Sequence, residues 1–357
     1  MNPSFFEAHQ IRLIQAPMAG SQNHQLAAAV FKAGGMGSIP AAMLTSEQLK
    51  NELVAFQNTI STATDTNSWG GSLPVNVNFF CHSPPAAQAE KELAWRAKLA
   101  STYLAHGIDP QSVGSGPGRA PFSEESLTLI GQTKPAVVSF HFGLPKAEWV
   151  QQIKAWGIQI WSSATTVQEA QWLAQNGADA VIAQGLEAGG HRGMFLTEDL
   201  STQVGTLALL PQIVKAIKLP VIAAGGISSP AAVSAAKTLG ASAVQVGTAF
   251  LTSNEASTSA LHRQALMSDA AKHTALTNLF SGRPARGIVN KFMQEFGPLN
   301  PEAPAFPLAT AAVAPLRAAA EAKGSADYSP LWSGQNASDC QALPAAEIAH
   351  KLLQGWA

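Results

Sequence analysis

The chain has 357 residues, of which 46% are hydrophobic and 13% charged, and its formal net charge is −1. This composition excludes a disordered chain and supports a large buried core. The lysines and arginines are scattered without a basic stripe, so we expect neither a nucleic-acid partner nor an anionic membrane partner.

The first 20 residues include the acidic Glu7 and lack a sustained apolar run. They therefore resemble neither a signal peptide nor a transmembrane helix, and we expect a cytoplasmic protein. The two cysteines, Cys81 and Cys340, are far apart and lack CxxC spacing, which indicates neither a disulfide framework nor a zinc site. Any redox chemistry must therefore come from a cofactor.

Short apolar runs with strand character alternate with Ala-rich segments of helical spacing along the chain. The candidate strands are Arg12–Pro17, Met36–Pro40, Val75–Phe80, Ala136–Phe140, Gln159–Ser162, Ala180–Gln184, Pro220–Ala224 and Ala243–Gly247. This alternation predicts parallel strands joined by crossover helices, in the α/β class. Eight such units favour a closed TIM-type (α/β)8 barrel over an open sheet.

Two segments depart from this alternation. The polar segment 58–71 is predicted to be a loop, and 256–330 has helical spacing without a strand-like run. We therefore expect a barrel over 1–254, a smaller helical insertion domain over 255–330 that covers the substrate, and a return segment with a closing helix over 331–357. An insertion after the last barrel strand lies over the mouth of the barrel, so this one is a candidate lid.

The last two predicted strands end in turns that suit an anion. The turn residues are Gly225 and Gly226, followed by a Ser-Ser-Pro helix start, and then Gly247 and Thr248. Glycines let backbone N–H groups approach a ligand, and helix N-termini favour negative charge. Together these turns predict a phosphate held by main-chain amides and hydroxyls. Taken singly, each could also be an ordinary tight turn, and the chain carries neither P-loop nor Rossmann fingerprint.

The sixth predicted strand runs into the sequence AQGLEAGGHRG. Its end projects Gln184, Gly189 and His191 over the barrel mouth, where His191 is the natural group for proton transfer or anion stabilisation. His141, after the fourth strand, faces the same mouth with either a substrate-facing or a structural role. Neither histidine has the spacing of a metal site, so we predict no metal.

Two further features point to a flat polar ligand. The first strand ends in Gln-Ala-Pro-Met-Ala-Gly around Met18, an extended shelf that could hold main-chain amides against a ring, or form a simple strand exit. Asn78 is a polar residue inside an apolar strand and requires a partner, which a cofactor oxygen would supply.

The chain resembles the nitronate monooxygenases, formerly called 2-nitropropane dioxygenases. The resemblance is carried by IQAPMAG, VNVNFF, VVSFHFGLP, AQGLEAGGHRG, VIAAGGIS, VQVGTAF, FSGRPARGIVNKF and SPLWSGQ, in this order over nearly the whole chain. It implies a barrel that carries FMN non-covalently, with a helical domain over the substrate. The implied flavin contacts are Met18, Asn78, Gln184, Gly189, Gly226, Gln245, Val246, Gly247 and Thr248, and the implied catalytic histidine is His191.

The resemblance also implies an activity. Alkyl nitronates, such as propionate 3-nitronate, would be oxidised by O2 to a carbonyl compound and nitrite through one-electron transfer to FMN, without a nicotinamide cofactor. His191 would hydrogen-bond the nitronate anion, or abstract the Cα proton of a neutral nitroalkane. We take His141, Tyr328 and Lys291 as candidate substrate contacts; Lys291 and Arg283 could also be solvated. Asn23-His24 replaces the usual Thr-Pro at the edge of the flavin pocket.

Two other functions remain open from sequence. One is an FMN-dependent NAD(P)H reductase of the enoyl-acyl-carrier-protein reductase or quinone reductase type, since fold analogy does not separate it from a monooxygenase. The other is a non-catalytic binder of a phosphorylated ligand. The apolar helices of the insertion also leave homo-oligomerisation open.

Overall fold

The computed structural model describes residues 4–61, 69–86, 88–116 and 119–357. Eight parallel strands form one sheet, in the order β1-β9-β8-β6-β5-β4-β3-β2. They are β1 Leu13–Gln15, β2 Ser38–Pro40, β3 Leu73–Phe80, β4 Pro135–His141, β5 Gln159–Ala164, β6 Ala180–Gln184, β8 Val221–Ala224 and β9 Ala243–Val246. A parallel bridge between Ile14 and Met36 joins the two edges of the sheet. The barrel is therefore closed, and all eight predicted strands are confirmed.

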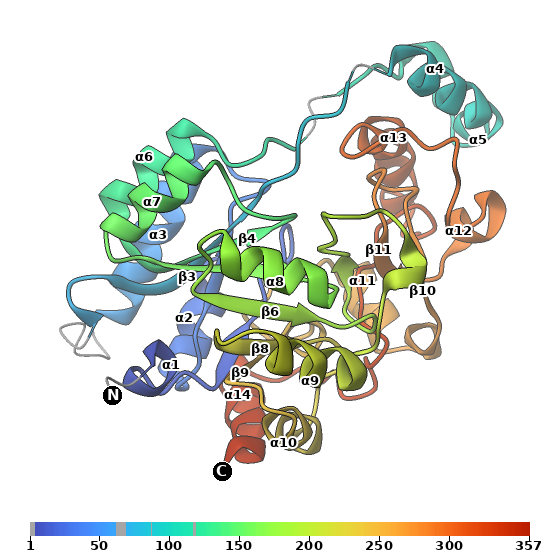
Figure 1. Ribbon diagram of the computed structural model, residues 1–357. Helices are drawn as coiled ribbons and strands as arrows, with labels where there is room; N and C mark the ends of the chain where they lie inside the picture. The colour runs from blue at the N-terminus through green and yellow to red at the C-terminus, as the bar shows by residue number, and fades with distance from the viewer. Residues whose placement is uncertain (1–3, 62–68, 87, 117–118) are drawn as a thin grey trace.

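Helices surround the barrel, as parallel strands require (Figure 1). They are α1 Phe5–Ala8, α2 His24–Lys32, α3 Ser46–Ile60, α6 Glu124–Thr133, α7 Ala147–Ala155, α8 Val167–Gln175, α9 Thr206–Ala216, α10 Pro230–Thr238 and α14 Ala345–Leu353, with short 3-10 turns at η2 Pro110–Ser112, η3 Leu200–Thr202, η4 Thr248–Phe250, η5 Asp269–Lys272 and η6 Gln354–Trp356. The closing helix α14 buries Ala345, Ile348, Ala349 and Leu352, a helical spacing that explains why it packs back on the barrel. It lies within the segment 331–357, where a closing helix was predicted.

The segment expected as a loop over 58–71 is partly helical. Asn58, Thr59 and Ile60 form the last turn of α3, which begins with a capping box between Thr45 and Gln48. Ile60 is fully buried, so apolar packing extends this helix into the polar stretch. Positions 62–68 lie outside the described residues.

The amino end of the barrel is closed by apolar side chains. Phe6 from α1 stacks on Trp161 with ring centroids 5.2 Å apart, and both are buried with Ile14, Met36 and Ala180 in one cluster. This packing fills the barrel interior from the side where the strands begin. A ligand can therefore enter only from the end where the strands finish, among the described residues.

The insertion after β9 contains the expected helices and also two short strands, which the sequence analysis did not predict. Its helices are α11 Ala260–Leu266, α12 Lys291–Phe296 and α13 Ala309–Glu321, and its strands are β10 Thr274–Thr277 and β11 Ala285–Ile288. Strand β11 pairs antiparallel with β7 Gly190–His191 from the loop after β6. Strands of four residues with mixed side chains are hard to predict from the local sequence. They form here because β11 pairs with both β10 and β7, and β7 comes from another part of the chain.

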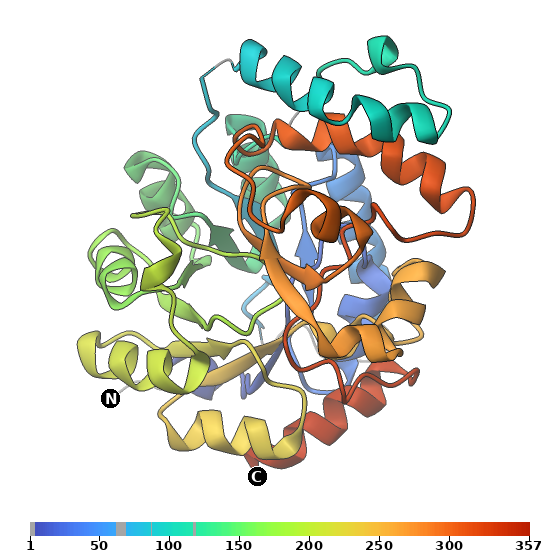
Figure 2. The same ribbon diagram turned by 90° about the vertical axis from the view of Figure 1, so that its right-hand side faces the viewer.

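Two helices from the connection between β3 and α6 join the insertion. They are α4 Ala89–Lys98 and α5 Ala100–Ala105, and Figure 2 shows them lying along α13. Trp95, Leu99 and Tyr103 share a buried cluster with Val313 and Leu316 of α13. The division into 1–254, 255–330 and 331–357 stays a proposal. We add α4 and α5 to the part that covers the barrel mouth, because they pack on α13 of the insertion. In the part of the chain described, no helix has the length and apolar character to cross a bilayer.

Candidate active site

One cavity opens where the barrel strands end, and its lining comes from seven of the eight strands and the loops that follow them. Its lining includes Met18, Asn78, Gln184, Gly189, Gly226, Gln245, Val246, Gly247 and Thr248, together with His141 and His191. These are all the residues expected at the cofactor and both histidines. The carboxyl ends of the strands of one barrel meet at one face, which explains why motifs far apart in sequence converge here.

The turns after β8 and β9 form one end of the cavity, the phosphate end. Gly225 and Gly226 have φ values of +120° and +70°, conformations that favour glycine. The N–H groups of Gly226, Gly247 and Thr248 donate no hydrogen bond to the described residues. Helix α10 begins beside this turn with Ser229 as its N-cap. Free N–H groups near a helix start suit an anion.

The return segment adds a wall to the phosphate end that sequence reasoning missed. The Gly334 N–H donates to Thr248 Oγ1 at 2.9 Å, and Asn336 Nδ2 donates to the Gly226 carbonyl at 3.3 Å. A Cβ on Gly334 would lie 2.9 Å from the Glu187 carbonyl oxygen, so this close approach requires glycine. The glycine in SPLWSGQ was the available signal.

Polar side chains lie along the middle of the cavity. Gln184 Oε1 accepts the Gly193 N–H at 2.8 Å, and its Nε2 donates to the His191 carbonyl at 3.0 Å, which fixes the orientation of this amide. Asn78 Nδ2 donates to the Ser139 hydroxyl at 3.0 Å. Gln245 Oε1 is buried and has no donor among the described residues. A buried acceptor without a donor is costly, so this oxygen requires an N–H or O–H from a ligand.

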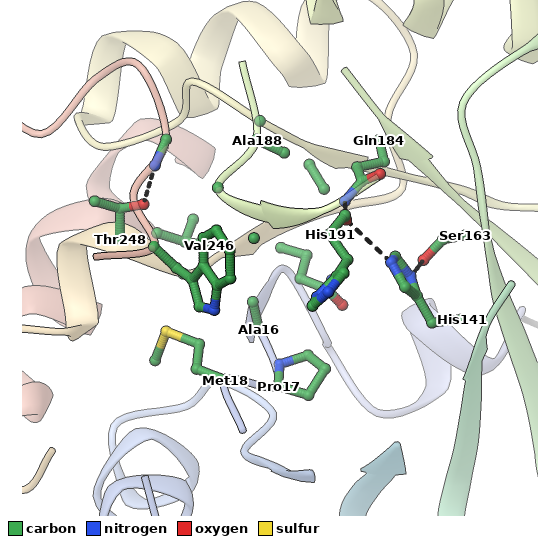
Figure 3. A pocket seen from close by; sticks show the side chains of 18 of the residues that line it. Ala16, Pro17, Met18, His141, Ser163, Gln184, Ala188, His191, Val246 and Thr248 are labelled. Atoms are coloured by element: carbon green, nitrogen blue, oxygen red, sulfur yellow. Dashed lines mark hydrogen bonds between the residues drawn. The ribbon is translucent and has the colours of Figure 1, made fainter. Parts of the chain in front are cut away.

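His191 lies at the other end, the imidazole end, as the second residue of β7 (Figure 3). Its Nε2 is 2.8 Å from the Ser281 hydroxyl oxygen, while Nδ1 makes no hydrogen bond to the described residues. The rings of Phe306 and Trp332 lie 5.4 and 5.6 Å from the imidazole, centroid to centroid. Burial, then the nearby cations led by Arg119, hold the pKa of His191 well below its usual value. The imidazole is therefore neutral at neutral pH.

His141 also lines the cavity, but its ring is already engaged. Its Nε2 lies 3.1 Å from the His191 carbonyl and must carry the proton, since a carbonyl only accepts. Its Nδ1 then accepts from the Ser163 hydroxyl at 3.0 Å, and burial lowers its pKa to about 4. Both ring nitrogens of His141 are therefore occupied, and its role as a substrate contact stays a prediction. With Gln184, it clamps the backbone of His191.

Tyr328 and Lys291 do not line the cavity. Tyr328 is 1% exposed, within the core that α12 and α13 share, and its hydroxyl lies 3.5 Å from the Glu295 carboxylate. Lys291 is half-exposed, with its ammonium 3.6 Å from the same carboxylate. Neither side chain is part of the cavity lining in this structure, because Tyr328 packs into that core and Lys291 pairs with Glu295. Their role as substrate contacts stays a prediction. Arg283 lies nearer, with its guanidinium 4.1 Å from the Phe142 ring centroid.

Arg192 supports the loop that carries His191, and sequence reasoning missed it. The side chain is fully buried and donates to the carbonyls of Gly185 at 2.7 Å and Gln184 at 2.8 Å and to Gln203 Oε1 at 2.9 Å. Its position directly after His191 in AQGLEAGGHRG was the signal. Within the described ranges, no group of three or more histidine, cysteine or acidic residues could hold a metal ion.

Comparison with known proteins agrees with this arrangement. The family model described as nitronate monooxygenase matches residues 4–355. Nitronate monooxygenases of Pseudomonas aeruginosa and Paraburkholderia phytofirmans are 41% and 40% identical to this chain, covering 96% and 95% of it and 95% and 90% of their own lengths.

Solved structures extend the comparison. A nitroalkane oxidase from Streptomyces ansochromogenes superposes with a TM-score of 0.88 at 34% identity over 99% of both chains. FabK from Thermotoga maritima shares the fold alone, with a TM-score of 0.68 at 22% identity over 100% of this chain and 96% of that one. The chain is therefore an oxidoreductase that belongs to the nitronate monooxygenase family.

Proposed function

We propose that this protein binds FMN and oxidises alkyl nitronates, such as propionate 3-nitronate, with O2 to a carbonyl compound and nitrite, assisted by His191. One observation carries the proposal: free main-chain N–H groups and a neutral imidazole lie at opposite ends of one cavity. The cytoplasmic location expected from the sequence, without nucleic-acid or membrane partners, stays a prediction, and homo-oligomerisation stays open.

The residues present fit FMN. Its phosphate would accept from the N–H groups of Gly226, Gly247 and Thr248, which have no acceptor among the described residues. The unpaired Gln245 Oε1 would accept a ring N–H of the isoalloxazine, and Asn78 and Gln184 flank the same wall. When bound, the flavin supplies the electron transfer between nitronate and O2.

His191 can serve either form of the substrate through its contact with Ser281. A hydroxyl both donates and accepts, so Ser281 can pair with either tautomer of the ring. If Ser281 donates to Nε2, the Nδ1–H is free to donate to a nitronate anion. If Nε2–H donates to Ser281, Nδ1 is a base that can take the Cα proton of a neutral nitroalkane. A neutral His191 is required in both cases, which agrees with its lowered pKa.

The test is to purify the protein and to mix it, without O2, with nitronate, NADH or NADPH. We expect a yellow protein with a flavin absorption spectrum, whose heat-released chromophore is FMN. Nitronate should bleach the flavin absorbance without O2, and NADH or NADPH should not. On readmission of O2, nitrite should form in proportion to the nitronate consumed.

The same experiment discriminates the functions left open by sequence. Rapid bleaching by NADH or NADPH, with no response to nitronate, would overturn the proposal in favour of a reductase. A protein that stays colourless after reconstitution with FMN would support a binder of another phosphorylated ligand.

A further inference from the structure

The lining of the cavity has an unusual charge balance. Of the described residues that line it, Arg119 is the one lysine or arginine, and none is an aspartate or glutamate. Both lining histidines have lowered pKa values and are neutral at neutral pH. The cavity wall therefore carries a single positive charge without a counter-charge.

Arg119 differs from the other shielded arginines of the molecule. Arg192 makes three hydrogen bonds and Arg263 makes four, all to protein oxygens. The Arg119 guanidinium makes no hydrogen bond and no ion pair with any described residue, although it is only partly exposed. Withdrawing a cation from water without a partner is costly, so a guanidinium that faces the cavity without a partner among the described residues suits an anionic ligand.

The fold holds Arg119 at the imidazole end of the cavity. His82 Nε2 donates to the Arg119 carbonyl at 3.0 Å, and the His82 ring packs edge-on against Phe306 at 4.8 Å between centroids. Phe306 in turn contacts His191, with centroids 5.4 Å apart. Arg119 is also the strongest of the charges that lower the pKa of His191. The phosphate end, by contrast, is built from main-chain N–H groups.

We propose that Arg119 binds the negatively charged oxygens of the substrate and so selects a nitronate anion over the neutral nitroalkane with the same carbon skeleton. This inference rests on the proposed function. Arg119 is then a specificity-determining residue: its guanidinium pairs with a charge that the nitronate carries and the protonated compound lacks. His191 remains the group beside the reacting carbon.

The test compares two substrates that differ by one proton, a primary nitroalkane and the nitronate prepared from it. In Arg119→Gln, kcat/KM for the nitronate should fall by roughly 10- to 100-fold, mostly through KM, because a charge-assisted contact is lost. The kcat/KM of the same variant for the nitroalkane should stay within about twofold of the wild-type value. Arg119→Lys should restore part of the loss, and Lys291→Gln, which removes a cation outside the cavity, should change neither substrate.

A binding measurement without turnover accompanies the kinetics. Nitrate, an unreactive planar anion, is titrated into the FMN-loaded protein and followed by the flavin absorbance. We expect Arg119→Gln to weaken nitrate binding by roughly tenfold or more at unchanged flavin content.

Three outcomes would overturn the inference. They are an equal loss for both substrates, no loss for either, and a loss of FMN instead of nitronate affinity, which would assign Arg119 to the cofactor. If the wild-type protein fails to oxidise nitronate, the proposed function fails, and the nitrate titration alone decides whether Arg119 is an anion site.

Discussion

The two ends of the cavity are built in different ways. The phosphate end is made mainly of main-chain N–H groups from two consecutive turns, at Gly225–Gly226 and Gly247–Thr248. The imidazole end is made of side chains from distant segments, with His191 held between Ser281 of the insertion and the clamp of Gln184 and His141. The first end depends on local backbone conformation, and the second depends on how remote segments pack.

Because of this difference, flavin binding and turnover should depend on different residues. Main-chain donors are fixed by the turn and cannot be removed by changing one side chain, so the phosphate end tolerates most substitutions except those at its glycines. At the imidazole end, by contrast, a single substitution can remove each contact, because side chains make it. Changes at the two ends should therefore affect different measurements, flavin affinity at one end and turnover at the other.

The largest effect is expected at His191. Of the two histidines among the described residues that line the cavity, only His191 has a ring nitrogen without a hydrogen-bond partner. His191→Ala removes it, and kcat/KM for nitronate should fall by about 10²- to 10⁴-fold. Flavin content should stay at the wild-type level, because the phosphate end is untouched. His350→Ala, on the exposed face of α14, is the control. Activity within about tenfold of wild type would remove His191 from the mechanism.

A change at the phosphate end should act on affinity for FMN. Gly226→Asp forces a side chain into a φ of +70° and adds a carboxylate beside the free N–H groups, so the Kd for FMN should rise by about 100-fold or more. Titration of FMN fluorescence into the apoprotein measures this. Gly157→Asp is the matched control, because it has a φ of +77° and open space at the Cβ. Equal losses in both variants would assign the effect to backbone strain alone.

The contact between Ser281 and His191 should have a smaller effect. Ser281→Ala leaves the imidazole Nε2 without its partner at 2.8 Å and frees the ring to change tautomer. We expect a loss of about tenfold in kcat, close to the worth of one hydrogen bond, with FMN binding unchanged. Ser234→Ala on α10, whose side chain is exposed, serves for comparison. A loss as large as that of His191→Ala would show that the ring depends entirely on Ser281.

Acid should destabilise the fold through its buried histidines. Burial lowers the pKa of His141 and of His262 from 6.5 to about 4, so the unfolded chain binds more protons than the folded one in this interval. Stability is therefore highest above pH 6.5 and is lost as the pH falls toward 4, by up to about 1.4 kcal/mol per pH unit for each histidine. Urea unfolding at several pH values measures the slope. His141→Asn should flatten it, and stability that rises on acidification would contradict this assignment.

The smallest effect is expected at Tyr328. Tyr328→Phe removes a hydroxyl that only approaches the Glu295 carboxylate at 3.5 Å, outside the cavity. Nitronate kinetics should stay within about twofold and stability within about 1 kcal/mol of wild type. A rise in KM of tenfold or more would restore Tyr328 as a substrate contact.

The barrel and the turns of the phosphate end could be predicted from local sequence patterns. Eight apolar runs followed by helical spacing specify parallel strands, because strands buried on both faces must be continuously apolar. Gly226 was recognisable because a turn at positive φ favours glycine in the local sequence, and Gly247 was recognisable as the glycine that follows the next strand. His191 was found for the same reason, as the polar residue directly after a Gly-Gly pair at a strand end.

The surroundings of the imidazole could not be predicted in this way, because they depend on how distant segments pack. The pairing of β11 with β7, the contact of Ser281 with His191 and the approach of Arg119 all join segments about 70 to 100 residues apart in the chain. No local pattern encodes such contacts, since each depends on where an insertion folds back. The same cause keeps Tyr328 and Lys291 out of the cavity lining, because the loop that carries Tyr328 and the helix that carries Lys291 pack elsewhere.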